Sequence, residues 1–102
     1  MIASYIDPAG EERAFDVGCL GDFQSLLAEA GTSVLLEHEN GSSLAFSARS
    51  GLAFLVWTDP MRYVFSWQGA DADALACVRA YVETGWPTAE GVRFTHDGIA
   101  PD

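Results

Sequence analysis

Lysine is absent from this chain of 102 residues, and its five basic residues are all arginine. Fifteen Asp and Glu residues oppose them, which gives a formal net charge of −10. Phosphate backbones and anionic lipids are bound by clustered Lys and Arg, so the composition argues against direct nucleic-acid or membrane binding. An acidic surface instead attracts a basic partner, or it serves only general solubility.

Long apolar runs are also missing. The longest, residues 52–57, is far too short to cross a bilayer, and residues 1–8 lack the basic and apolar regions of a secretory signal. We therefore expect a cytoplasmic protein. Cys19 and Cys77 are isolated from each other, and we expect both to be buried thiols in a reducing compartment.

Recognisable catalytic and metal-binding motifs are likewise lacking. Neither of the two histidines, His38 and His96, lies near a nucleophile signature, and two Cys and two His so widely scattered do not have zinc-site spacing. The ten glycines are dispersed and form no phosphate-binding loop. The sequence predicts no catalytic residues, no metal and no cofactor, and hence a protein that is not an enzyme.

The residues that are present predict one folded domain over residues 1–102, since 49% of them are hydrophobic. Asn40-Gly41 and residues 58–61 are turn sequences between alternating or apolar segments. The expected strands are 2–6, 13–17, 33–39, 43–49, 52–57, 62–68 and a short final strand at 92–95, followed by a polar tail.

Two helices are expected between these strands. The first spans residues 22–30 with Asp22 as its N-cap and Gly31 after its end. The second begins at a cap formed by Asp71 or Asp73 and ends before Gly85. The fold class is therefore α+β: an antiparallel sheet of about five to six strands with two helices packed mainly on one face.

The turn at Ser50-Gly51 decides which side chains of the sheet face the core. A three-residue turn there places Leu52, Phe54 and Val56 in the core, together with Val34, Leu36, Leu44, Phe46, Tyr63, Phe65 and Trp67. Leu35, Glu37, Glu39, Ala45, Ser47, Ala53, Leu55, Trp57, Arg62, Val64 and Ser66 then form an exposed face, unusually apolar for a solvated surface. A two-residue turn instead places Trp57 in the core, and the sequence leaves both alternatives open.

The C-terminal third resembles a known family. An Ala-rich helix opens with residues 71–75 and ends in Tyr81-Val82-Glu83-Thr84-Gly85-Trp86-Pro87, and the stretch Val92-Arg93-Phe94 follows. This pattern resembles the C-terminal signature of the Imm1 family of bacterial immunity proteins, although the family more usually has Trp where Phe94 stands. Residues 51–57 and 62–69 are similar to the family's central hairpin. The resemblance implies neutralisation of a cognate toxin delivered between competing bacteria.

The resemblance, together with the acidic charge, implies a kind of toxin and a set of binding residues. Many such toxins are nucleases or deaminases with basic clefts, and a net charge of −10 suits an inhibitor that covers such a cleft in a 1:1 complex with a monomer. The predicted partner-binding residues are Glu37, Glu39, Trp57, Asp59, Arg62 and Trp86, and the last of these has the alternative role of packing its turn onto the core. The competing hypothesis is a small non-catalytic ligand-binding or regulatory domain, which a deep pocket between sheet and helices would favour.

Overall fold

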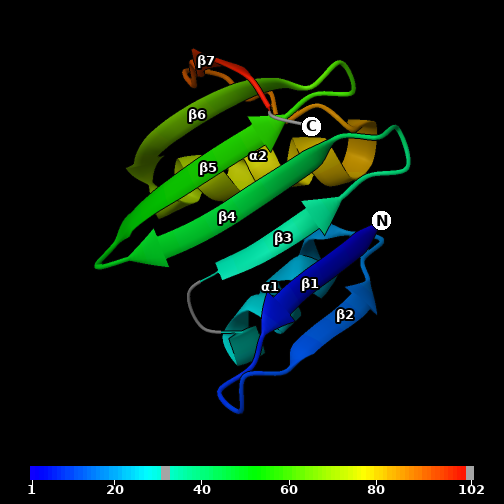
Figure 1. The fold of residues 1–102 in the computed structure, drawn as a ribbon. Coiled ribbons are helices and arrows are strands. Elements are labelled where there is room, and N and C mark those ends of the chain that lie inside the picture. The colour runs from blue at the N-terminus through cyan, green and yellow to red at the C-terminus, as the bar shows by residue number, and fades with distance from the viewer. Residues whose placement is uncertain (31–32, 101–102) are drawn as a thin grey trace.

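The chain folds into one antiparallel sheet with two helices, in a computed structural model that describes residues 1–30 and 33–100 (Figure 1). The seven strands lie in the order β2-β1-β3-β4-β5-β6-β7, and all neighbours are antiparallel. In chain order the elements are β1 (Ile2–Ile6), β2 (Glu12–Asp16), α1 (Leu20–Ala30), β3 (Ser33–Glu37), β4 (Ser43–Arg49), β5 (Leu52–Thr58), β6 (Tyr63–Ala70), α2 (Asp71–Thr84) and β7 (Thr95–Ile99). The predicted α+β class is confirmed, with slightly more strands than expected.

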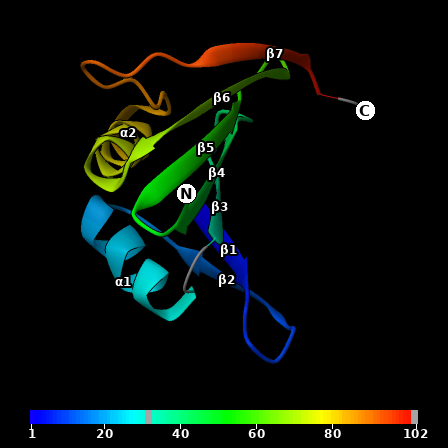
Figure 2. The ribbon, with the colours of Figure 1, turned by 90° about the vertical axis from the view of Figure 1, so that its left-hand side faces the viewer.

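Both helices pack on the same face of the sheet. Helix α1 contacts β1 and β3, helix α2 contacts β5 and β6, and the two helices touch each other. Figure 2 shows the helices on one side of the strands, and no helix of the described residues covers the other side. We call this second side the uncovered face.

The core lies between the sheet and the helices, and its buried side chains alternate with outward-pointing ones along β1, β3 and β5. Phe23 of α1 and Phe46 of β4 meet edge to face with ring centroids 5.3 Å apart. Burial of such side chains is the main stabilising term of a domain this size. The buried strand positions are Ala3, Tyr5, Val34, Leu36, Leu44, Phe46, Ala53, Leu55 and Trp57.

The β4–β5 turn has two residues, which decides between the two registers that the sequence left open. Ser50 and Gly51 both have positive φ, 55° and 80°, as a type I′ turn requires, and Arg49 pairs directly with Leu52. Ala53, Leu55 and Trp57 are therefore buried, whereas the expectation that Leu52, Phe54 and Val56 belong to the core is wrong. The alternative that places Trp57 in the core is confirmed.

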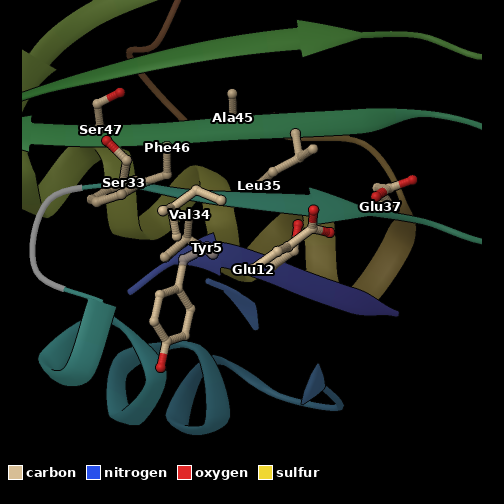
Figure 3. A pocket seen from close by; sticks show the side chains of 11 residues that line it. Tyr5, Glu12, Ser33, Val34, Leu35, Glu37, Ala45, Phe46 and Ser47 are labelled. Carbon is tan, nitrogen blue, oxygen red and sulfur yellow. The ribbon is translucent and has the colours of Figure 1, made fainter. Parts of the chain in front are cut away.

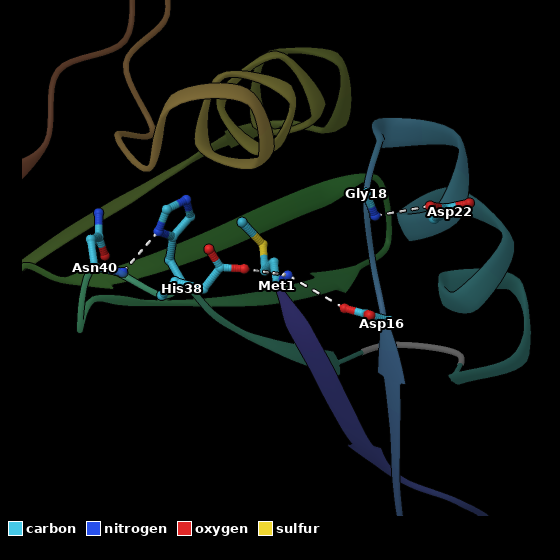
Figure 4. Close-up of polar contacts among 7 residues, drawn as sticks. Met1, Asp16, Gly18, Asp22, His38 and Asn40 are labelled. Atoms are coloured by element: carbon cyan, nitrogen blue, oxygen red, sulfur yellow. Dashed lines mark hydrogen bonds and ion pairs between the residues drawn. The ribbon is translucent and has the colours of Figure 1, made fainter.

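Helix α1 begins two residues earlier than predicted. It starts at Leu20, so Asp22 lies inside the first turn and is not the N-cap; its carboxylate accepts the Gly18 N–H at 2.9 Å instead (Figure 4). Gly31, predicted to follow the helix, lies outside the described residues. Cys19 is exposed, against expectation, because the helix buries Phe23 and Leu26 and leaves the residue before its start in solvent.

Helix α2 matches its predicted span, but its cap differs. Ala70 is the N-cap and no side chain caps the helix, so the capping role predicted for Asp71 or Asp73 is wrong. Both carboxylates lie in the first turn, where they interact favourably with the helix dipole. Gly85 ends the helix as predicted, with a φ of 83° and its N–H donating to the Tyr81 carbonyl at 2.7 Å.

The final strand lies later than predicted. It spans Thr95–Ile99 and not residues 92–95, and it pairs with β6 across an irregularity between Val64 and Phe65. Val92 and Phe94 pack partly buried against the core from an irregular segment. Their alternation therefore came from core packing and not from sheet pairing.

Candidate protein-binding face

The uncovered face carries an apolar strip where a solvated sheet normally carries polar side chains. Its members alternate along β1, β3 and β5 with buried residues, so they point away from the helices. Phe54 and Val56, near the centre of the sheet, are 38% and 42% exposed. The exposed apolar side chains of this face are Ile2, Ile6, Leu35, Leu52, Phe54 and Val56.

Carboxylates border the strip on the side of β1, β2 and β3. Glu37 of β3 and Asp16 of β2 both pair with Ile2, and Glu12 of β2 pairs with Ile6, so all three acids project from the uncovered face. No ion pair joins Glu12 or Glu37 to a basic group in the part of the chain that the structure describes. The face therefore combines exposed apolar area with negative charge.

A groove of about 460 Å³ opens on the same face, over β1, β3 and β4. Leu35 and Ala45 contribute apolar surface, and Glu12 and Glu37 contribute carboxylates (Figure 3). Its lining also includes Tyr5, Val34 and Phe46, whose side chains belong to the core, so the groove opens on the uncovered face and extends inwards between β1 and β3. This location places the groove within reach of a partner docked on the strip.

The acidic residues predicted to bind a partner have different environments. Glu37 is exposed on the uncovered face, next to the apolar strip. Glu39 lies beyond the end of β3, with its carboxylate 3.6 Å from the amino group of Met1. Asp59 accepts the N–H groups of Met61 and Tyr63, each at 2.9 Å, so its carboxylate holds the β5–β6 turn.

The aromatic and basic residues predicted to bind a partner lie away from the strip. Trp57 is only 8% exposed, so the expectation of an exposed anchor on the outer face is wrong. Trp86 is 47% exposed, and its ring packs edge to face on Trp57 with centroids 5.2 Å apart, in agreement with the alternative of turn packing. Arg62 lies in the β5–β6 turn with a φ of 72°. Of the six predicted residues, Glu37 is the one that lies in a strand and points from the uncovered face.

Phe54 and Val56 are surface residues because of one turn, whose length the sequence left open. A two-residue loop pairs Ala48 with Ala53. Because side chains alternate along a strand, this register points Phe54 and Val56 away from the helices. The available signal was the Ser50-Gly51 pair, since Gly at the second position suits the left-handed backbone of a two-residue hairpin.

A polar network on the helix side joins α2 to the β3–β4 hairpin, and its Tyr81–Ser42 contact is buried. The Tyr81 hydroxyl is 2.9 Å from the Ser42 hydroxyl, which donates to the side-chain oxygen of Asn40. The Asn40 N–H donates to Nδ1 of His38 at 3.1 Å (Figure 4), and its side-chain amide donates to the Gly85 carbonyl at 3.4 Å. Burial raises the pKa of Tyr81, so its hydroxyl stays protonated and has a structural role as a hydrogen-bonding group.

No protein-family model, curated protein or solved structure matches this chain. Neither described helix has the length and apolar character needed to span a membrane. Within residues 1–30 and 33–100, no three His, Cys, Asp or Glu side chains are grouped as metal ligands would be. The fold, the uncovered face and its charge therefore carry the functional argument.

Proposed function

We propose that this protein binds and neutralises a basic bacterial toxin domain, a nuclease or deaminase acting on nucleic acid, and that the uncovered face is its binding surface. The observation that carries the proposal is the apolar strip of β5, exposed on a sheet face that no described helix covers. The resemblance of residues 71–87 to bacterial immunity proteins supplies the kind of partner.

The strip supplies the free energy of binding. Antiparallel sheets with one face in water normally carry polar residues there, and contiguous apolar side chains mark interaction surfaces. Phe54 and Val56 keep about two-fifths of their side chains exposed. Covering this exposed part with a partner contributes roughly 1 kcal/mol for each side chain, and the neighbouring Leu35 and Leu52 extend the contact.

The negative charge selects for a basic partner. A net charge of −10, with Glu12, Asp16 and Glu37 on the binding face, repels nucleic acid and attracts the basic cleft of an enzyme that binds it. Such steering raises the association rate at low salt and loses effect as ionic strength rises.

A pulldown with a matched control tests the proposal. The tagged protein is expressed with the C-terminal domain encoded by the adjacent large open reading frame, and both co-purification and protection of the cells are measured. Phe54→Ser/Val56→Ser is expected to weaken binding by about tenfold or more, because it removes the centre of the strip.

The control carries two apolar-to-serine changes elsewhere on the surface. Met61 lies in the β5–β6 turn and Ile99 lies in β7, and both are more exposed than Phe54. Met61→Ser/Ile99→Ser is expected to bind and protect as the wild type does. Equal binding by both double variants would contradict the assignment of the face. Absence of any partner or protection would refute immunity and favour the regulatory or ligand-binding alternative.

A further inference from the structure

The groove on the uncovered face exists because two neighbouring strands part. β1 and β3 pair only through Ile2–Ser4 and Leu35–Glu37. Beyond Ser4, β1 continues to pair with β2 alone, while Ser33 and Val34 of β3 pair with β4 alone. The separation leaves the groove of about 460 Å³ between them (Figure 3).

The lining of the groove combines an apolar surface with hydrogen-bond acceptors. Leu35 and Ala45 are apolar, and Ile6, 62% exposed, lines the groove from β1. Glu12 reaches the groove from β2 and Glu37 from β3. Ser4, Ser33 and Ser47 also line it, as do Tyr5, Val34 and Phe46 of the core. No arginine is among the lining residues that the structure describes, so two like charges share the groove without a cation.

We propose that this groove binds one arginine side chain of the protein partner. The inference rests on the proposed function, since the arginine belongs to the partner docked on the uncovered face. An arginine stem matches the apolar lining formed by Leu35 and Ala45, and its five N–H donors can reach carboxylates and hydroxyls in several directions. A lysine ammonium is a compact, strongly hydrated point charge and fits dispersed acceptors less well.

Binding of an arginine in the groove also explains how the toxin would be neutralised. Proteins that act on nucleic acid use arginine to contact phosphate oxygens. Glu12 and Glu37 offer carboxylate oxygens in place of phosphate, so the partner's arginine is held by this protein and withdrawn from its substrate.

The test uses a probe that does not require the cognate toxin. The blocked tripeptide Ac-Gly-Arg-Gly-NH2 is titrated into the ¹⁵N-labelled protein, with the citrulline and lysine tripeptides as comparators. Saturable shifts are expected at the amides of Ser33, Leu35 and Ala45 with the arginine peptide. The citrulline peptide, which lacks the charge, and the lysine peptide are each expected to bind about fivefold or more weakly.

Charge-neutralising variants locate the site. Glu12→Gln/Glu37→Gln is expected to weaken arginine binding by about fivefold or more. Glu83→Gln/Glu90→Gln removes the same charge from exposed positions outside the groove and is expected to bind as the wild type does. Equal weakening by both pairs, or equal binding of the three peptides, would overturn the proposal.

Failure of the groove proposal can be distinguished from failure of the proposed toxin binding. Arginine binding that depends on Glu12 and Glu37 supports the groove even if no toxin is found. If Phe54→Ser/Val56→Ser abolishes toxin binding while Glu12→Gln/Glu37→Gln changes it by less than about twofold, the groove proposal fails and the face proposal stands.

Discussion

The Tyr81 hydroxyl links the end of α2 to the β3–β4 hairpin, and its removal tests how much this link stabilises the fold. Tyr81 is fully buried, Ser42 is 3% exposed, and their hydroxyls lie 2.9 Å apart. Tyr81→Phe keeps the ring and its edge-to-face contact with His38 but deletes the hydrogen bond. The Ser42 hydroxyl keeps its bond to Asn40. A buried neutral hydrogen bond of this kind contributes about 1–1.5 kcal/mol, and we expect Tyr81→Phe to lower the free energy of unfolding by that amount.

Urea unfolding followed by tryptophan fluorescence measures the change. With a slope of about 1 kcal/mol per molar urea for a domain of this size, the midpoint should fall by about 1–1.5 M with the slope unchanged. Tyr63→Phe is the matched control, because Tyr63 is 39% exposed and its substitution should change stability by less than about 0.5 kcal/mol.

A double-mutant cycle separates the hydrogen bond from the other consequences of the change. Ser42→Ala removes the partner of Tyr81 and also the bond to Asn40, so it should be destabilising by itself. The double variant should be less destabilised than the sum of the single variants by about 0.5–1 kcal/mol, since the shared bond is lost only once. A Tyr81→Phe loss below about 0.3 kcal/mol, or an additive cycle, would refute the network as a stabilising unit.

Three further predictions concern backbone and burial. Ser50→Asn should raise the unfolding free energy by about 0.5–1 kcal/mol in thermal unfolding, because Asn tolerates the left-handed φ of 55° and precedes Gly51 as type I′ turns prefer; a lower melting temperature would contradict the turn assignment. Gly69→Ala should cost about 1–2 kcal/mol and shift tryptophan fluorescence, because the added Cβ collides with the Trp67 ring; unchanged stability and emission would show that the ring does not lie over Gly69. Burial raises the pKa of Cys77 from 9.0 to about 11. The thiol therefore ionises more readily in the unfolded chain, and the stability that its burial gives is present below pH 9 and is lost as pH rises towards 11. Cys77→Ala should therefore make stability fall less steeply across that range in urea titrations, and an unchanged slope would contradict the prediction.

Local patterns determined most of the secondary structure, since each depends on neighbours in the chain. Helix α2 follows from its apolar spacing and from Gly85, whose backbone adopts the left-handed conformation that stops a helix. Asn40-Gly41 predicted the β3–β4 hairpin because its geometry is set within a few residues. The number of strands was less certain, as the irregular stretch around Val92 alternates like a strand without pairing.

The tertiary structure decided between the two faces of β5 that the sequence left open. Both faces of residues 52–57 are apolar, so hydrophobicity does not distinguish them, and one residue more in the Ser50-Gly51 turn would exchange them. Packing against α2 and the 86–94 segment selects Trp57 for the core and leaves Phe54 exposed. The parting of β1 from β3 is also a long-range outcome, because it depends on how two sequence-distant strands pair. The net charge and the turns are therefore properties of the sequence, whereas the apolar face and its acidic groove are properties of the fold.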